Sequence, residues 1–142
     1  MIEGAPETIE ERNRVLFERT KQFGDPVYSE EMGLVIRPNH GSEMMSRWGF
    51  DVHQSSAWYA VSLARWCRDH ANNCEEEQRR LNRIIVRMCE KQERDPESPF
   101  YGRIISRWHW PDASQAPNAV NFWLPEIGHL YNHSRDLLKP ET

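Results

Sequence analysis

The stretch LNRIIVRMCEKQ, residues 81–92, decides the fold class of this chain. Its apolar side chains recur at alternating steps of three and four residues, which places them on one side of a helix. They are Leu81, Ile84, Ile85, Met88 and Cys89, and Gln92 continues the series. The other side is basic, with Arg79, Arg80, Arg83, Arg87 and Lys91. The pattern predicts an amphipathic helix with a solvated, ion-paired outer face, which ends at Asp95-Pro96 because proline cannot continue it.

A second helix is predicted immediately before this one. In SSAWYAVSLARWCRDH, residues 55–70, Tyr59, Leu63 and Trp66 share one face, and Ser55 or Ser56 is expected to cap the first turn. Only a short turn at Asn72-Asn73 follows, where Asn73 is expected to cap the next helix. The sequence therefore predicts an antiparallel helical hairpin over residues 55–94.

Two further helices are predicted outside the hairpin. Thr8 and Glu11 have the spacing of a capping box and indicate an N-terminal helix within residues 1–24, in which Ile9, Leu16, Thr20 and Phe23 recur at helical spacing. A final helix is expected over residues 121–138, beginning between Asn121 and Pro125. Its expected inner face consists of Ile127, Leu130, Tyr131, Ser134 and Leu138.

The connections between these helices are long. Residues 25–54 are predicted to be irregular, with short extended pieces at Val27-Tyr28 and Leu34–Ile36, and residues 95–120 are predicted to form an aromatic loop. No segment alternates with a period of two for long enough to build a sheet. We therefore predict an all-α fold, with residues 1–142 forming a single helical domain or fragment.

Composition excludes several classes of function. The net charge is −4, which is unfavourable for nucleic-acid binding. No apolar run is long enough to span a membrane, and no secretory signal is present at the start. Three cysteines, Cys67, Cys74 and Cys89, form no metal motif and are expected to be reduced thiols. We expect a cytoplasmic protein without a cofactor.

Three stretches together resemble repeat units of an uncharacterised group of bacterial and fungal (α/α) toroid proteins. They are HQSSAWYAVSLARW (53–66), RIIVRMCEKQERDPESPFYG (83–102) and NFWLPEIGHL (121–130). The resemblance implies a partial toroid built from antiparallel helical hairpins, with long aromatic loops. A full ring needs about twelve helices, so it also implies that the helix faces of this chain meet a homo-oligomer or a complementary chain.

Many toroids of this type bind carbohydrate in a central cleft as glycoside hydrolases or lyases, and a few act on terpenoids. The resemblance thus implies a small-molecule or carbohydrate ligand held by the loops at 48–58 and 101–123. Indoles stack on sugar faces, and six tryptophans are present. The residues expected to bind the ligand are Trp58, Tyr101, Trp108, Trp110, Asn121 and Trp123.

Four residues are candidates for acid–base chemistry. Asp51 and His53 precede the second helix, and His109 and Asp112 lie in the aromatic loop. A carboxylate that orients an imidazole is a sound general base. The competing interpretation is that these side chains satisfy backbone donors at helix starts and that the tryptophans only pack.

His129 and His133 are one helical turn apart, which is the spacing of many zinc ligands. The glutamate of the zinc protease motif is absent, since residues 130–132 are Leu-Tyr-Asn. Two surface histidines and no metal site are therefore the favoured interpretation.

Three hypotheses of function remain open from the sequence. The first is a toroid that binds a carbohydrate-like ligand, with or without hydrolase or lyase activity. The second is a terpenoid-processing toroid whose aromatic side chains line an apolar cavity, where their rings can stabilise a cation. The third is a non-catalytic helical interaction module or an inactive fragment.

Overall fold

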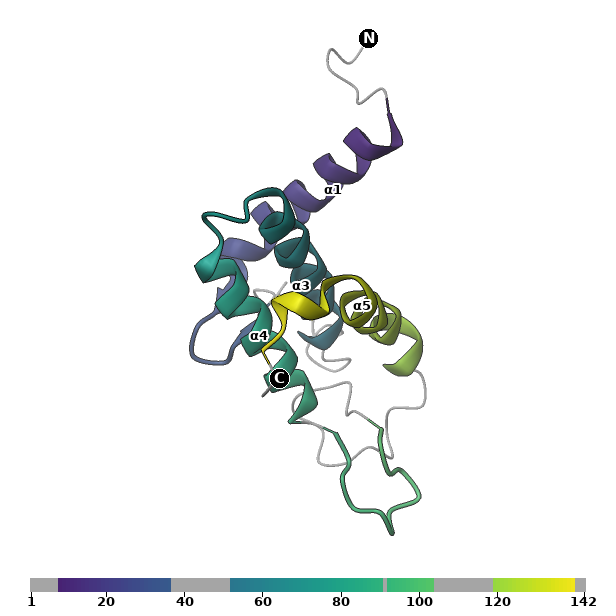
Figure 1. The fold of residues 1–142 in the computed structure, drawn as a ribbon. Coiled ribbons are helices and arrows are strands. Elements are labelled where there is room, and N and C mark those ends of the chain that lie inside the picture. Colours follow the sequence, from purple (N-terminus) through teal and green to yellow (C-terminus); the bar gives the residue numbers. More distant parts are fainter. Residues whose placement is uncertain (1–7, 37–51, 91, 104–118, 140–142) are drawn as a thin grey trace, which may run out of the picture.

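The computed structural model describes residues 8–36, 52–90, 92–103 and 119–139, with backbone only for 52–54 and 119–124 (Figure 1). The described part is mostly helical, which confirms the predicted helical class. The predicted toroid arrangement stays a prediction. Its four α-helices are α1 (Ile9–Gly24), α3 (Val52–Asp69), α4 (Glu75–Cys89) and α5 (Ala119–Ser134). Short 3-10 helices cover η1 (Asp25–Val27) and η3 (Arg135–Leu137). No described helix has the length and apolar character needed to cross a bilayer.

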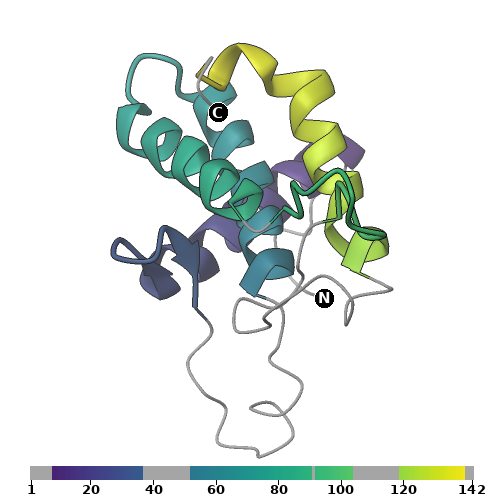
Figure 2. The same cartoon turned by 90° about the horizontal axis from the view of Figure 1, so that it is seen from below.

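Helix α3 lies at the centre of the fold. It contacts α1, α4 and α5, and Figure 2 shows α4 and α5 on two sides of it. Three alanines, Ala57, Ala60 and Ala64, are fully or almost fully buried on α3, and their small side chains allow the neighbouring helices to approach closely. The predicted hairpin is therefore present as α3 and α4, and α1 and α5 are packed around it.

The core is formed by the faces that the helical periodicity predicted. Leu81, Ile84 and Met88 of α4 are at most 1% exposed, as is Leu130 of α5. The expectation that the hairpin faces need a partner outside the chain is wrong for these four residues, because the chain itself covers them. This expectation failed because the sequence does not show how α5 and the small sheet fold back onto the hairpin.

The connection between α1 and α3 contains the two predicted extended pieces. Strands β1 (Tyr28–Ser29) and β2 (Leu34–Val35) pair antiparallel, with Tyr28 opposite Val35. The turn between them needs Gly33, whose φ of 67° lies in the left-handed region. Leu34 and Val35 are buried, so this short sheet closes one side of the core.

Helix starts agree with the sequence at one site and differ at others. Thr8 and Glu11 form both hydrogen bonds of the predicted capping box. Helix α3 begins at Val52, before the predicted Ser55 or Ser56 cap. The buried Ser56 hydroxyl lies within the helix and accepts the backbone N–H of Val35 at 2.9 Å.

The predicted cap at Asn73 is also wrong. Cys74 occupies the cap position of α4 and forms no side-chain capping bond, while the backbone N–H of Asn73 donates to His70 within the turn. Helix α5 begins at Ala119, earlier than predicted, so Pro125 lies inside it. A proline at this position removes one backbone hydrogen bond without ending the helix.

Residues that follow α5 are fastened to α4 by a buried amide. Asn82 is 6% exposed, and its Nδ2 donates to the Leu137 carbonyl at 3.0 Å, while its Oδ1 accepts the backbone N–H of Lys139 at 2.7 Å. Gln78 donates to the same Leu137 carbonyl at 3.0 Å. These bonds hold the chain after η3 against the hairpin.

Candidate functional site

The N-terminal ends of α3 and α5 lie at the same end of the helical body. Trp58 contacts Glu126 and Arg68 contacts Asp136, so the two helices run in the same direction. Helix α4 returns from α3 after a short turn and therefore ends near the start of α3 (Figure 1). The segments that hold most of the predicted site residues join the described chain at this end.

The structure brings the predicted ligand-binding residue Trp58 of α3 together with a carboxylate of α5, Glu126. Trp58 Nε1 donates to Glu126 Oε1 at 3.0 Å, and Trp58 remains 41% exposed. The other oxygen of Glu126 is buried and has no hydrogen-bond partner within the described part of the chain. The indole is thus held in place by a carboxylate while part of its ring stays accessible.

The remaining predicted site residues have different outcomes. Tyr101 lies in the turn after α4 and is 63% exposed. His53 lies in the first turn of α3, and Asn121 and Trp123 lie in the first turn and a half of α5, where only the backbone is described. Asp51, Trp108, His109, Trp110 and Asp112 lie outside the described residues. Their predicted roles therefore stay predictions.

An apolar groove lies beside Trp58, between the end of α1 and the start of α3. Its volume is about 280 Å³, and Phe23, Val35 and Tyr59 contribute to its lining. Phe23 is 57% exposed and belongs to an apolar stripe along α1, defined by Ile9, Leu16 and Phe23. Phe23 belongs to both the stripe and the groove, so the exposed apolar surface of α1 continues onto α3.

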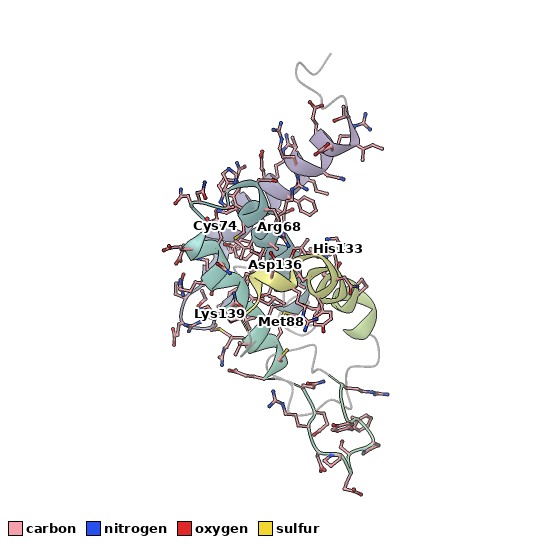
Figure 3. All side chains as sticks on the ribbon, in the orientation of Figure 1. Arg68, Cys74, Met88, His133, Asp136 and Lys139 are labelled. Atoms are coloured by element: carbon pink, nitrogen blue, oxygen red, sulfur yellow. The ribbon has the colours of Figure 1, made fainter. Side chains whose placement is uncertain are left out.

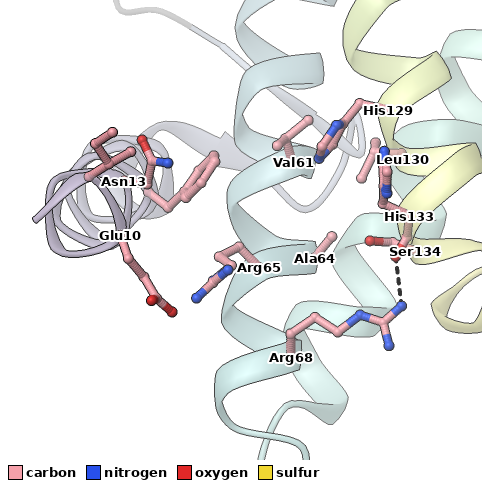
Figure 4. A pocket seen from close by; sticks show the side chains of 12 residues that line it. Glu10, Asn13, Val61, Ala64, Arg65, Arg68, His129, Leu130, His133 and Ser134 are labelled. Atoms are coloured by element: carbon pink, nitrogen blue, oxygen red, sulfur yellow. Dashed lines mark hydrogen bonds between the residues drawn. The ribbon is translucent and has the colours of Figure 1, made fainter.

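A larger groove of about 660 Å³ lies between α1, α3 and α5. Its floor is apolar and includes Val61, Ala64 and Leu130. Its rim is polar, as Figure 4 shows. The polar side chains around it are Glu10, Asn13, Arg65, Arg68, His129, His133 and Ser134.

The arginines of this groove are held by ion pairs. Arg68 donates to Asp136 and, through Nη2, to the His133 carbonyl at 2.8 Å. Arg65 Nε donates to Asp69 at 2.9 Å. Figure 3 shows Arg68, His133 and Asp136 close together where α3 meets the end of α5. Arg68 therefore connects α3 to the end of α5, Arg65 pairs within α3, and the charge of both arginines is compensated.

The basic face of α4 has a structural function that the sequence did not reveal. Arg79 Nη2 bonds Glu30 at 2.8 Å, Arg83 donates to the Glu31 carbonyl, and Arg87 Nε donates to the Met32 carbonyl at 2.9 Å. Each arginine thus reaches the turn between β1 and β2. The predicted ion-paired face is present, but it also anchors this turn.

Electrostatics around α4 shift the pKa values of two groups. Hydrogen bonds from Arg79, and then from Arg80, lower the pKa of Glu76 to about 2. Burial, and then a hydrogen bond to Asp25 at 2.6 Å, raises the pKa of Tyr59, so its hydroxyl stays protonated and donates to the carboxylate. Both groups serve an ion-paired network that joins α1 and α4.

The described cysteines are not arranged as nucleophiles. Burial raises the pKa of the Cys67 thiol to about 12, and its Sγ lies 3.6 Å from the Cys74 carbonyl. Burial also raises the pKa of Cys89. A thiol reacts as its thiolate, so these groups are unreactive at neutral pH.

Comparisons with protein-family models, with curated proteins and with solved structures found no match for this chain. The resemblance to (α/α) toroids therefore stays a prediction.

Proposed function

We propose that this chain is a non-catalytic helical interaction module, which binds an acidic amphipathic helix of another protein along α1. The observation that supports the proposal is the apolar stripe. Ile9, Leu16 and Phe23 are spaced by seven residues and are 78%, 60% and 57% exposed. Residues at this spacing drift by only about 20° per step around a helix, so the three side chains form one line.

Helix α1 has the shape that such binding needs. Its first turns project beyond the other helices (Figure 1). A helix of 16 residues is roughly 24 Å long, which is enough for a partner helix to contact all three apolar side chains. The groove lined by Phe23 and Trp58 continues the surface at the end of α1.

The charges beside the stripe favour an acidic partner. Arg12 and Arg19 are both exposed, and each follows an apolar residue of the stripe by three positions, so they lie along one edge of it. The opposite edge holds Asn13 and Thr20, which are uncharged. An antiparallel second copy centred on Leu16 would place Arg12 close to Arg19 of the other α1, and like charges repel. A helix with glutamates at its flanks complements this edge.

Two synthetic helices with identical leucine stripes and either glutamate or lysine flanks test this proposal. We expect the full chain to bind the glutamate helix, measured by fluorescence anisotropy, and to bind the lysine helix about tenfold more weakly. Two exposed pairs that change from attracting to repelling together alter affinity by about that order. Leu16→Asp should abolish binding. Val86→Asp is the matched control, because Val86 is 37% exposed on α4, away from the stripe.

Two results would overturn the proposal. Equal binding of both helices, or binding of neither, would remove the acidic helix as the partner. Sedimentation that shows self-association of the wild-type chain, lost in Leu16→Asp, would identify a second copy as the occupant of the stripe.

A second candidate function is binding of a carbohydrate-like ligand at Trp58. The supporting observation is the partly exposed indole, which Glu126 holds beside a groove. Neutral oligosaccharides should quench tryptophan fluorescence of the wild-type chain and leave Trp58→Ala unchanged. Trp66→Phe is the control, because Trp66 stacks on His70 elsewhere on α3. Quenching by a prenyl analogue instead would favour the terpenoid hypothesis, and an unchanged response in Trp58→Ala would remove Trp58 from the site.

A further inference from the structure

The polar rim of the large groove contains two histidines that lie against each other. His129 and His133 are both exposed on α5, their ring centroids are 4.6 Å apart, and their planes are tilted by 40°. Figure 4 shows both rings on the wall of the groove. We propose that His129 and His133 together bind one divalent transition-metal ion, such as Ni²⁺ or Zn²⁺, between their imidazole nitrogens.

The distance between the rings fits a shared ion. Imidazole nitrogens bind zinc at about 2.0–2.1 Å, which places the centres of two ligating rings roughly 5 Å apart for an angle near the tetrahedral value. The observed separation of 4.6 Å is close to this value. The separation of the two rings is therefore compatible with one nitrogen of each ring binding the same ion.

The backbone that carries the two histidines is fixed. Leu130 is 1% exposed and Ser134 is 6% exposed, so the adjacent side of this turn is packed. The His133 carbonyl also accepts a hydrogen bond from Arg68 at 2.8 Å. A metal ion thus meets a pair of ligands whose spacing is already set, which lowers the cost of binding.

The surrounding charges are compatible with a cation. Arg65 and Arg68 face the groove from α3, and each is paired with an aspartate, Asp69 and Asp136 respectively. Glu10 lines the opposite wall from α1 and contributes negative charge. These two arginines are therefore neutralised by partners of their own.

The ligand set predicts which ions bind. Imidazole suits nickel, copper and zinc, whereas magnesium and calcium prefer oxygen ligands. The described residues contain no cluster of three or more histidine, cysteine or acidic side chains suited to a metal. Water molecules therefore fill the remaining coordination positions of the ion, and other ligands can replace them.

Calorimetric titration of the full chain with Ni²⁺ tests the proposal. We expect saturable binding of one ion to this pair, a rise of a few degrees in the melting temperature, and no such response to Mg²⁺. The response should weaken as the solution is acidified, because protons compete with the metal for imidazole nitrogens.

The decisive variant exchanges two neighbours, Tyr131→His together with His133→Tyr. It keeps the composition of the chain but places the histidines two residues apart, on different sides of α5. Tyr131 is 56% exposed, so the exchange leaves the core intact. We expect the nickel signal of the pair to vanish, while His70→Asn, which changes a histidine stacked on Trp66, keeps it.

Nickel binding that is unchanged in the exchanged variant would overturn the proposal, as would loss of binding in His70→Asn. The melting temperature of each variant without metal shows whether it is folded. A nickel-dependent shift of imidazole resonances from His129 and His133, observed by NMR in the wild-type chain, gives the same answer without any substitution.

Discussion

Helices α4 and α1 have similar sequence patterns but different surroundings. Each carries apolar side chains at helical spacing, and each was predicted as an amphipathic helix. In α4 the apolar side chains Leu81 and Ile84 are fully buried, whereas in α1 Ile9 and Leu16 are 78% and 60% exposed. The difference shows that periodicity predicts an apolar helix face but not whether the rest of the chain covers that face.

The reason lies in what α1 uses to join the fold. Lys21 of α1 lies 3.2 Å from Glu77 of α4, and Gly24 packs against the ring of Tyr59. These contacts are polar or backbone contacts near the end of α1. The apolar stripe of α1 lies beside this contact face, so much of it stays outside the core.

Ile84→Ala and Leu16→Ala should give the largest difference between the two helices. We expect Ile84→Ala to lower the free energy of unfolding by about 2–5 kcal/mol, because it leaves a cavity in the core. Leu16→Ala should change it by less than about 0.5 kcal/mol, since its side chain is mostly exposed. Urea denaturation measures both. Equal losses would mean that α1 is covered as completely as α4.

Gly24→Ala tests the point where α1 meets α3. A methyl group at Gly24 would lie 2.2 Å from a ring carbon of Tyr59, so the ring or the helix must move. We expect a loss of about 1–3 kcal/mol in the free energy of unfolding. In Gly128→Ala, the methyl group meets no atom within 4 Å on α5, and stability should be unchanged or slightly higher. A neutral Gly24→Ala would contradict the close packing of α1 on α3.

Thr8→Ala tests the far end of α1, where the helix makes few contacts with the body. Removal of the capping box should cost about 1 kcal/mol of local helix stability. We expect faster hydrogen exchange at the amides of the first turn, with little change in the urea midpoint. Thr20→Ala is the control, because its hydroxyl donates to the Leu16 carbonyl and caps nothing. Unchanged exchange in Thr8→Ala would contradict the role of the cap.

Glu76→Gln compares the outer face of α4 with that of α1 and should have the smallest effect. The folded pKa of about 2 lies below the ordinary value of 4.5, so the carboxylate stabilises the fold above pH 4.5 and this contribution is lost as pH falls towards 2. Because Glu76 is exposed, we expect less than about 1 kcal/mol at pH 7. Denaturation midpoints of the wild type and the variant should converge near pH 2. A constant difference would contradict this assignment.

Much of the helical framework could be predicted from the sequence because its signals are local. The capping box at Thr8 and the apolar series from Leu81 to Met88 each lie within a few turns, and both are confirmed. The Asn73 cap failed since a polar residue near a helix start offers a bond that the backbone need not use. The buried clamp at Asn82 was missed because its partners lie 55 and 57 residues away.

The candidate site was less predictable for the same physical reason. Trp58 was predicted as a ligand-binding residue, but its hydrogen bond to Glu126 spans 68 residues and leaves no local pattern. The His129 and His133 pair was visible because it is local, whereas the groove beside it depends on how α1 and α3 pack. His109 and Asp112 lie outside the described residues, so their acid–base roles stay predictions.

The clamp between Asn82 and the residues after α5 has a consequence for the order of events in folding. A ribosome releases Leu137 and Lys139 more than fifty residues after Asn82, so α4 leaves the exit tunnel before the bonds from Asn82 to these two residues can form. Closure of this long loop must precede the gain from its bonds. The nascent chain therefore closes this part of its interior only after Lys139 has been synthesised, when the segment after α5 reaches Asn82.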